Sequence, residues 1–105
     1  MKEIEPREVH ERRLAGEQMV LLDVREDEEV QFCSISDSIH IPMNEVPQRL
    51  QELKAEDAVV VYCRSGKRSM QVCNFLVARG FGRVMNLRGG INEWSLQVDP
   101  SIPRY

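Results

Sequence analysis

The run Ala58-Val59-Val60-Val61-Tyr62 is the feature that most constrains the fold of this 105-residue chain, and it leads directly into Cys63. The run is uninterrupted, apolar and β-branched, which is typical of a central strand in a parallel sheet with both faces covered. Parallel strands are joined by crossover helices, so such a strand predicts an α/β fold. Ligands of these folds bind at the carboxyl ends of the strands, and Cys63 stands at such an end.

Other segments predict the neighbours of this strand. Strands are predicted over residues 19–24, 39–41 and 84–87. Helices are predicted over 6–14, 26–30 and 44–56, between Met70 and a stop at Gly80, and from Gly89 through Trp94. The alternation predicts a mostly parallel sheet with helices on both faces. We find no repeat or linker, so residues 1–105 are expected to form a single domain.

Composition excludes several classes of protein. No run of eighteen apolar residues exists, and the first six residues lack the apolar stretch of a signal peptide, so neither a membrane partner nor export is expected. Three cysteines, an odd number, argue against a disulfide framework, and we expect a cytoplasmic protein. A net charge of -3 argues against nucleic acid as a partner. His10 and His40 are too far apart in the chain to suggest a metal site.

The segment after the central strand carries the chemistry. It places a thiol, then a glycine-containing basic loop, before a predicted helix, in the order Tyr62-Cys63-Arg64-Ser65-Gly66-Lys67-Arg68-Ser69. Free backbone amides, the helix dipole and the loop cations all favour an anion there. Such surroundings lower a cysteine pKa from about 8.5 to roughly 3.5–7.5. We therefore expect a nucleophilic thiolate that attracts anionic donors such as thiosulfate and attacks their sulfur.

The whole sequence resembles the rhodanese family. The resemblance rests on residues 21–26, 39–42, 63–69 and 87–94, which read LLDVRE, IHIP, CRSGKRS and LRGGINEW. It implies a rhodanese-like fold with a five-stranded parallel sheet, and a sulfurtransferase activity in which a cysteine cycles between thiol and persulfide. No metal or organic cofactor is implied. Residues 98–105 also look like the tail of rhodanese domains fused to adenylating enzymes that activate ubiquitin-like sulfur carriers, which suggests a protein sulfur acceptor or carrier.

The expected site residues follow from the loop and from the resemblance. Cys63 is expected to be the catalytic residue, and residues 63–68, here called the cysteine loop, are expected to cradle the sulfur. Asp23 and Arg25 are expected to support the site, although a purely structural ion pair is at least as good an interpretation. The expected substrate-binding and persulfide-binding residues are Arg64, Ser65, Gly66, Lys67, Arg68 and Ser69, with Arg68 as the organiser of the loop.

The two other cysteines are open questions. Many relatives have Gly-His-Ile-Pro-Gly-Ala where this chain has Cys33-Ser34-Ile35-Ser36-Asp37-Ser38. This departure could change substrate choice and bring Cys33 near Cys63, but a small buried cysteine in place of glycine is the simpler interpretation. Cys73 lies in an apolar helical stripe and is expected to be core, with a redox role as the alternative.

Two other functions compete with sulfur transfer. A cysteine phosphatase needs an arginine six positions after its nucleophile to bind phosphate bidentately, and that position holds Ser69. The loop is therefore one residue short for a tetrahedral phosphate. A non-catalytic binding module is the second alternative, since a fold does not dictate a function. The presence of Cys63 and its cations argues against it.

Overall fold

The computed structural model describes residues 2–105, so Met1 of the expected domain 1–105 lies outside it. One sheet of five parallel strands organises the fold, in the order β1-β5-β4-β2-β3. The strands are β1 (Lys2–Ile4), β2 (Val20–Asp23), β3 (Ile39–His40), β4 (Val59–Tyr62) and β5 (Val84–Leu87). The predicted central strand is indeed central.

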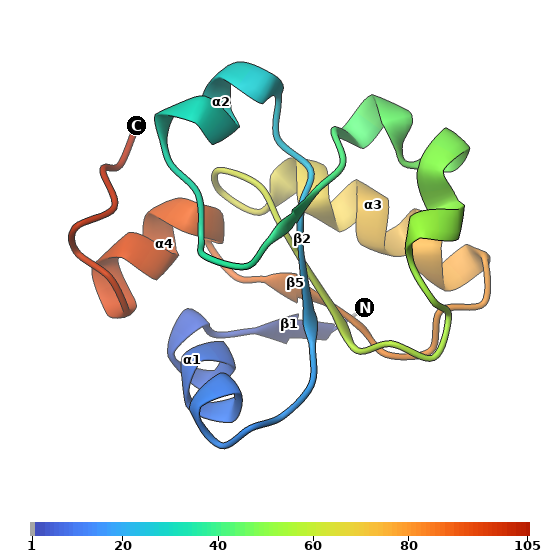
Figure 1. The fold of residues 1–105 in the computed structure, drawn as a ribbon, viewed down its shortest axis with the longest axis horizontal. Helices are drawn as coiled ribbons and strands as arrows, with labels where there is room; N and C mark the ends of the chain where they lie inside the picture. The colour runs from blue at the N-terminus through green and yellow to red at the C-terminus, as the bar shows by residue number, and fades with distance from the viewer. Residues whose placement is uncertain (1) are drawn as a thin grey trace.

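Helices cover both faces of this sheet. They are α1 (Pro6–Leu14), α2 (Asp27–Phe32), α3 (Lys67–Ala78) and α4 (Gly90–Gln97), with the short 3-10 helices η1 (Met43–Glu45) and η2 (Pro47–Glu52). Helices α1 and α4 lie on one side of the sheet and α3 on the other (Figure 1). The predicted α/β class, with a parallel five-stranded sheet between helices, is confirmed.

Strand β4 shows why the sheet needs two helical layers. Val59 and Val61 pack into one core cluster with residues of α3, and Val60 and Tyr62 pack into a second cluster with residues of α1 and α4. All four side chains have no exposed area. Each buried side chain of this kind contributes about 1.5–3 kcal/mol relative to an exposed one. Covering both faces therefore fixes β4, and with it the position of Cys63.

Two elements differ from the prediction. Strand β1 has no counterpart in the sequence pattern, because only Ile4 of its three residues is buried. The helix predicted over 44–56 is wrong: η1 and η2 take its place, and Arg49 inside η2 has non-helical dihedrals of φ -116° and ψ 20°. Pro47 has no N–H to donate to a preceding turn, which interrupts a continuous α-helix. No helix within residues 2–105 is long and apolar enough to span a membrane.

Candidate active site

The sulfur of Cys63 lies inside a ring of backbone amides that follows β4. The amide of Gly66 donates to Cys63 Sγ at 3.1 Å, and the amide of Ser69 lies 3.5 Å from it. The Ser69 hydroxyl is 3.4 Å from the same sulfur. Gly66 precedes α3 and has φ +103°, a left-handed conformation that glycine adopts without strain. The loop thus turns its N–H groups inward onto the sulfur.

These contacts favour an ionised sulfur. Burial raises the pKa of the Cys63 thiol, because the side chain is only 1% exposed. Hydrogen bonding with the Ser69 hydroxyl and with the amides of Ser69, Gly66 and Ser65 outweighs burial, so the pKa lies below its ordinary value. The geometry therefore provides what a thiolate or a persulfide anion requires, which is several fixed hydrogen-bond donors.

Helix α4 holds the start of the cysteine loop. The amide of Ile91 donates to the Cys63 carbonyl at 2.9 Å, and the amide of Asn92 donates to the Arg64 carbonyl at 3.2 Å. This approach leaves no room for a side chain at Gly90, where an added Cβ would lie 2.4 Å from the Arg64 carbonyl oxygen. Gly90 therefore serves the close packing of α4 on the loop.

The three loop cations have different surroundings. Arg64 and Lys67 are exposed, and the Arg64 guanidinium lies 5.2 Å from the ring centroid of Tyr105. Arg68 makes a two-pronged ion pair with Glu29 of α2, at 2.7 and 2.9 Å. The pKa of the Glu29 carboxyl falls to about 2, chiefly because of the hydrogen bond from Arg68. Arg68 thus fastens the loop to α2, while Arg64 and Lys67 face solvent.

Asp23 and Arg25 form a buried ion pair at the end of β2. The guanidinium donates to both carboxylate oxygens of Asp23, at 2.8–3.2 Å, and neither residue is exposed. Arg25 also donates to the Cys33 carbonyl at 2.6 Å and to the Tyr105 hydroxyl at 3.0 Å. These contacts join β2, α2 and the tail. None of them reaches Cys63 among the contacts of the described residues, so the pair belongs to the frame around the site.

The chain is similar in sequence and in fold to known proteins. The model of the rhodanese-like domain family matches residues 5–97, which is most of the chain. The chain belongs to the rhodanese family. It is similar to a protein named sulfurtransferase from Allochromatium vinosum, with 40% identity over 97% of this chain and 95% of that protein. It also resembles the solved rhodanese-like domain protein of Staphylococcus aureus, with a TM-score of 0.87, 28% identity, and coverage of 100% and 99% of the two chains.

A third similarity concerns multidomain relatives. The chain is 36% identical to the adenylyltransferase and sulfurtransferase MOCS3-2 of Zea mays over 86% of this chain and 20% of that protein. This agrees with the resemblance of the tail to rhodanese domains fused to adenylating enzymes. In this rhodanese domain the tail returns toward α2 (Figure 1), and the Tyr105 hydroxyl donates to Glu29 Oε2 at 2.6 Å. The tail is thus part of the scaffold that positions the loop cations.

The two remaining cysteines lie in different layers of the fold. Cys73 is fully buried in the α3 layer, and burial raises its pKa to about 12. Cys33 is half-buried and packs with the opposite core cluster, where its Sγ lies 3.6 Å from the Pro103 carbonyl. Cys33 and Cys63 therefore sit in different layers. All three cysteines are free thiols.

Three residues around the site were not singled out by the sequence. Asn86 of β5 is buried and contacts both Ser69 and Gly66. Glu29 holds Arg68, and Tyr105 donates to Glu29. A polar side chain inside a four-residue apolar strand is a signal that could have found Asn86. Glu29 and Tyr105 carry no local signal, because their partners lie in distant segments. Among residues 2–105, no three metal-ligating side chains gather into a possible metal site.

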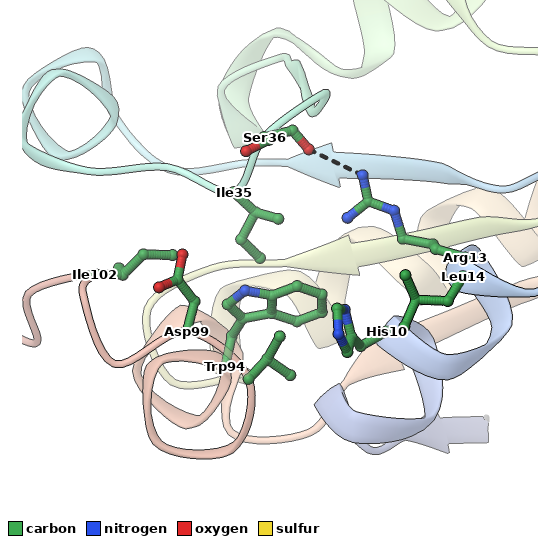
Figure 2. A pocket seen from close by; sticks show the side chains of 9 residues that line it. His10, Arg13, Leu14, Ile35, Ser36, Trp94, Asp99 and Ile102 are labelled. Atoms are coloured by element: carbon green, nitrogen blue, oxygen red, sulfur yellow. Dashed lines mark hydrogen bonds between the residues drawn. The ribbon is translucent and has the colours of Figure 1, made fainter.

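A surface cavity of about 460 Å³ lies away from the cysteine loop, between α1, the segment around Ile35 and α4. Figure 2 shows Trp94 beside His10, with Arg13 donating to the Ser36 carbonyl at 3.2 Å. The rings of His10 and Trp94 meet edge to face, with centroids 6.2 Å apart. These two contacts join residues of the cavity wall, and no residue that lines the cavity belongs to the cysteine loop.

Proposed function

We propose that this rhodanese is a sulfurtransferase that carries sulfane sulfur on Cys63. The observation that carries the proposal is the ring of amides around Cys63 Sγ in a chain of this family, with Gly66 N at 3.1 Å and Ser69 N at 3.5 Å. A persulfide extends the sulfur by one atom and keeps a negative charge, so the same donors suit both states. The naming of the Allochromatium relative as a sulfurtransferase supports the same general activity.

The reaction is a double displacement. The Cys63 thiolate attacks the outer sulfur of thiosulfate, the sulfur–sulfur bond of the donor breaks, and sulfite leaves with the bonding electron pair. An acceptor nucleophile then attacks the outer sulfur of the Cys63 persulfide, and the thiolate is regenerated. A persulfide donor reacts in the same way and releases a thiol. No electron is gained or lost overall, and no cofactor is required.

The loop residues have separate roles in this proposal. The exposed cations Arg64 and Lys67 attract the anionic donor, because opposite charge at the mouth of a site raises the local concentration of an anion. The backbone of Ser65, Gly66 and Ser69 stabilises the sulfur anion. Arg68 keeps the loop in place through Glu29.

A protein sulfur acceptor or carrier is the proposed physiological partner. It is supported by the plant adenylyltransferase and sulfurtransferase that shares this domain. The exposed residues of the cysteine loop, Arg64, Ser65 and Lys67, would meet that protein. We propose the cytoplasm as the compartment, because the three free thiols suit a reducing environment.

The test is mass spectrometry of the intact protein after treatment with thiosulfate, and separately with a small persulfide. We expect a gain of about 32 Da on Cys63 and its loss upon addition of cyanide or dithiothreitol. Cys63→Ser should abolish the gain, whereas Cys33→Ser, which removes a half-buried thiol of the other layer, should retain it. No gain with either donor would refute sulfur transfer. A gain with the persulfide alone would exclude thiosulfate as the donor.

A further inference from the structure

Asn86 is a buried carboxamide whose hydrogen-bonding groups are all engaged around the cysteine loop. Its Oδ1 accepts from Ser69 Oγ at 2.5 Å, and its Nδ2 donates to the Gly66 carbonyl at 3.0 Å and to Glu3 Oε2 at 3.2 Å. The residue lies in β5 with no exposed area, opposite Val61 of β4. A polar side chain in that position must be satisfied by hydrogen bonds, since burial without them is costly.

These contacts link Asn86 to the sulfur. Asn86 holds Gly66 and Ser69, and the backbone amides of both residues contact Cys63 Sγ. The orientation of the carboxamide is fixed by its partners, because a carbonyl and a carboxylate on the Nδ2 side both require a donor. Oδ1 therefore faces Ser69 and can only accept. The hydroxyl of Ser69 must be the donor in that bond.

The Ser69 hydroxyl consequently has one proton and two neighbours that can receive it. While that proton is bonded to Asn86, the Ser69 oxygen presents a lone pair to Cys63 Sγ at 3.4 Å. This arrangement accepts a hydrogen bond from a protonated thiol. A thiolate instead requires the hydroxyl to donate, which it cannot do without leaving Asn86.

We propose that Asn86 is a positioning residue for Cys63, which competes with the sulfur for the single hydroxyl proton of Ser69. In the thiol state the hydrogen bonds run from Cys63 to Ser69 to Asn86. When the sulfur ionises, the hydroxyl rotates and donates to it, and Asn86 Oδ1 loses its donor. Serine keeps its proton throughout, so only the direction of a hydrogen bond changes.

The competition has a role in the catalytic cycle, and this step rests on the proposed function. Once Cys63 carries an outer sulfur, the charge moves to that atom and the Ser69 hydroxyl returns to Asn86. When the acceptor takes the outer sulfur, Cys63 leaves as a thiolate and again receives the hydroxyl. Asn86 thus opposes the free thiolate while its amide group keeps Gly66 in place. Cys63 acts as a nucleophile in the first step and as a leaving group in the second, and the competition keeps the stability of its thiolate between the values that the two steps favour.

A double-mutant cycle on the pKa of Cys63 tests the proposal. The pKa is measured from thiolate absorbance in the ultraviolet, with the Cys63→Ser signal subtracted, so sulfur transfer is not needed. Asn86→Leu keeps the branched shape, removes the acceptor and also releases Gly66. In the Ser69→Ala background there is no hydroxyl to compete for, so Asn86→Leu acts there only by releasing Gly66. The difference between the two backgrounds therefore measures the competition.

Asn86→Leu changes the pKa of Cys63 in both backgrounds. With Ser69 present, this change should be more negative by about one unit than with alanine at position 69. Equal changes in the two backgrounds, or a change that is higher with Ser69, would overturn the proposal. If this pKa difference is found but Cys63 gains no mass with either sulfur donor, the sulfurtransferase function is refuted and the role of Asn86 is not.

A second measurement needs no substitution of Asn86. The side-chain amide resonance of Asn86 is followed by NMR as Cys63 titrates, in the wild type and in Ser69→Ala. Because the hydroxyl leaves Oδ1 when the sulfur ionises, the wild-type resonance should move with the midpoint of Cys63. The movement should be much smaller in Ser69→Ala, where only the charge of the sulfur acts on it. Movements of equal size would exclude a competing hydroxyl.

Discussion

Replacement of Arg25 by methionine removes one half of a fully buried ion pair. The Asp23 carboxyl is then left buried without its guanidinium partner, and the Arg25 backbone amide at 3.0 Å is among its remaining donors. Breaking a buried pair in this way costs about 3–5 kcal/mol. The substitution also removes the donor to the Cys33 carbonyl at 2.6 Å. Against a total stability of about 5–15 kcal/mol, Arg25→Met should fold but unfold much more easily.

Urea unfolding followed by circular dichroism measures this loss. For a slope of about 2 kcal/mol per molar, the midpoint should fall by about 2 M. Arg83→Met is the matched control, because Arg83 is exposed and should change stability by less than about 0.5 kcal/mol. Adding Asp23→Leu to Arg25→Met should restore part of the loss, since no buried charge remains. A loss below about 1 kcal/mol in the single variant would contradict the argument.

Three further predictions concern the surroundings of the site. Gly90→Ala should lower both stability and persulfide loading, because its Cβ would lie 2.4 Å from the Arg64 carbonyl oxygen. Gly80→Ala is the control: an added Cβ there meets no atom within 4 Å, so the left-handed φ of +93° should cost only about 1–2 kcal/mol of stability. Thermal unfolding and loading rates compare them, and equal losses would count against the close packing at Gly90. The folded pKa of Glu29, about 2, lies below its ordinary value of 4.5, so its contribution to stability is present above about pH 4.5 and is lost as pH falls toward 2. Urea unfolding at several pH values should therefore show a steeper acid loss in the wild type than in Glu29→Gln, and parallel curves would refute this. Tyr105→Phe removes hydroxyl contacts of 2.6 and 3.0 Å with Glu29 and Arg25 and should cost about 1–2 kcal/mol by the same assay, with an unchanged midpoint as the contrary outcome.

Most of the fold could be predicted because its signals are local. Strands β2, β4 and β5 are buried on both faces and appear in the sequence as apolar runs. Strand β1 could not be found in this way, because an edge strand of three residues with one buried side chain has no periodicity. The apolar stripe over 44–56 correctly indicated the burial of Val46 and Leu53. It did not indicate two short 3-10 helices, which Pro47 separates.

The candidate site shows the same division. Cys63 and its loop were predicted because a strand, a thiol, a glycine and basic residues follow one another in the chain. The residues that hold the loop were not predicted, because they are distant in the sequence from their partners. Glu29 lies 39 positions from Arg68, and Asn86 lies 17 positions from Ser69. Such pairs depend on how helices and strands pack, and a single sequence contains no local trace of them.

The bonds from Ile91 and Asn92 to the carbonyls of Cys63 and Arg64 tie the cysteine loop to a helix that comes much later in the chain. A fragment that ends before Gly90 lacks both donors, so nothing would hold the start of its loop in this way. The thiol of such a fragment should titrate closer to an ordinary cysteine, whose pKa is about 8.5.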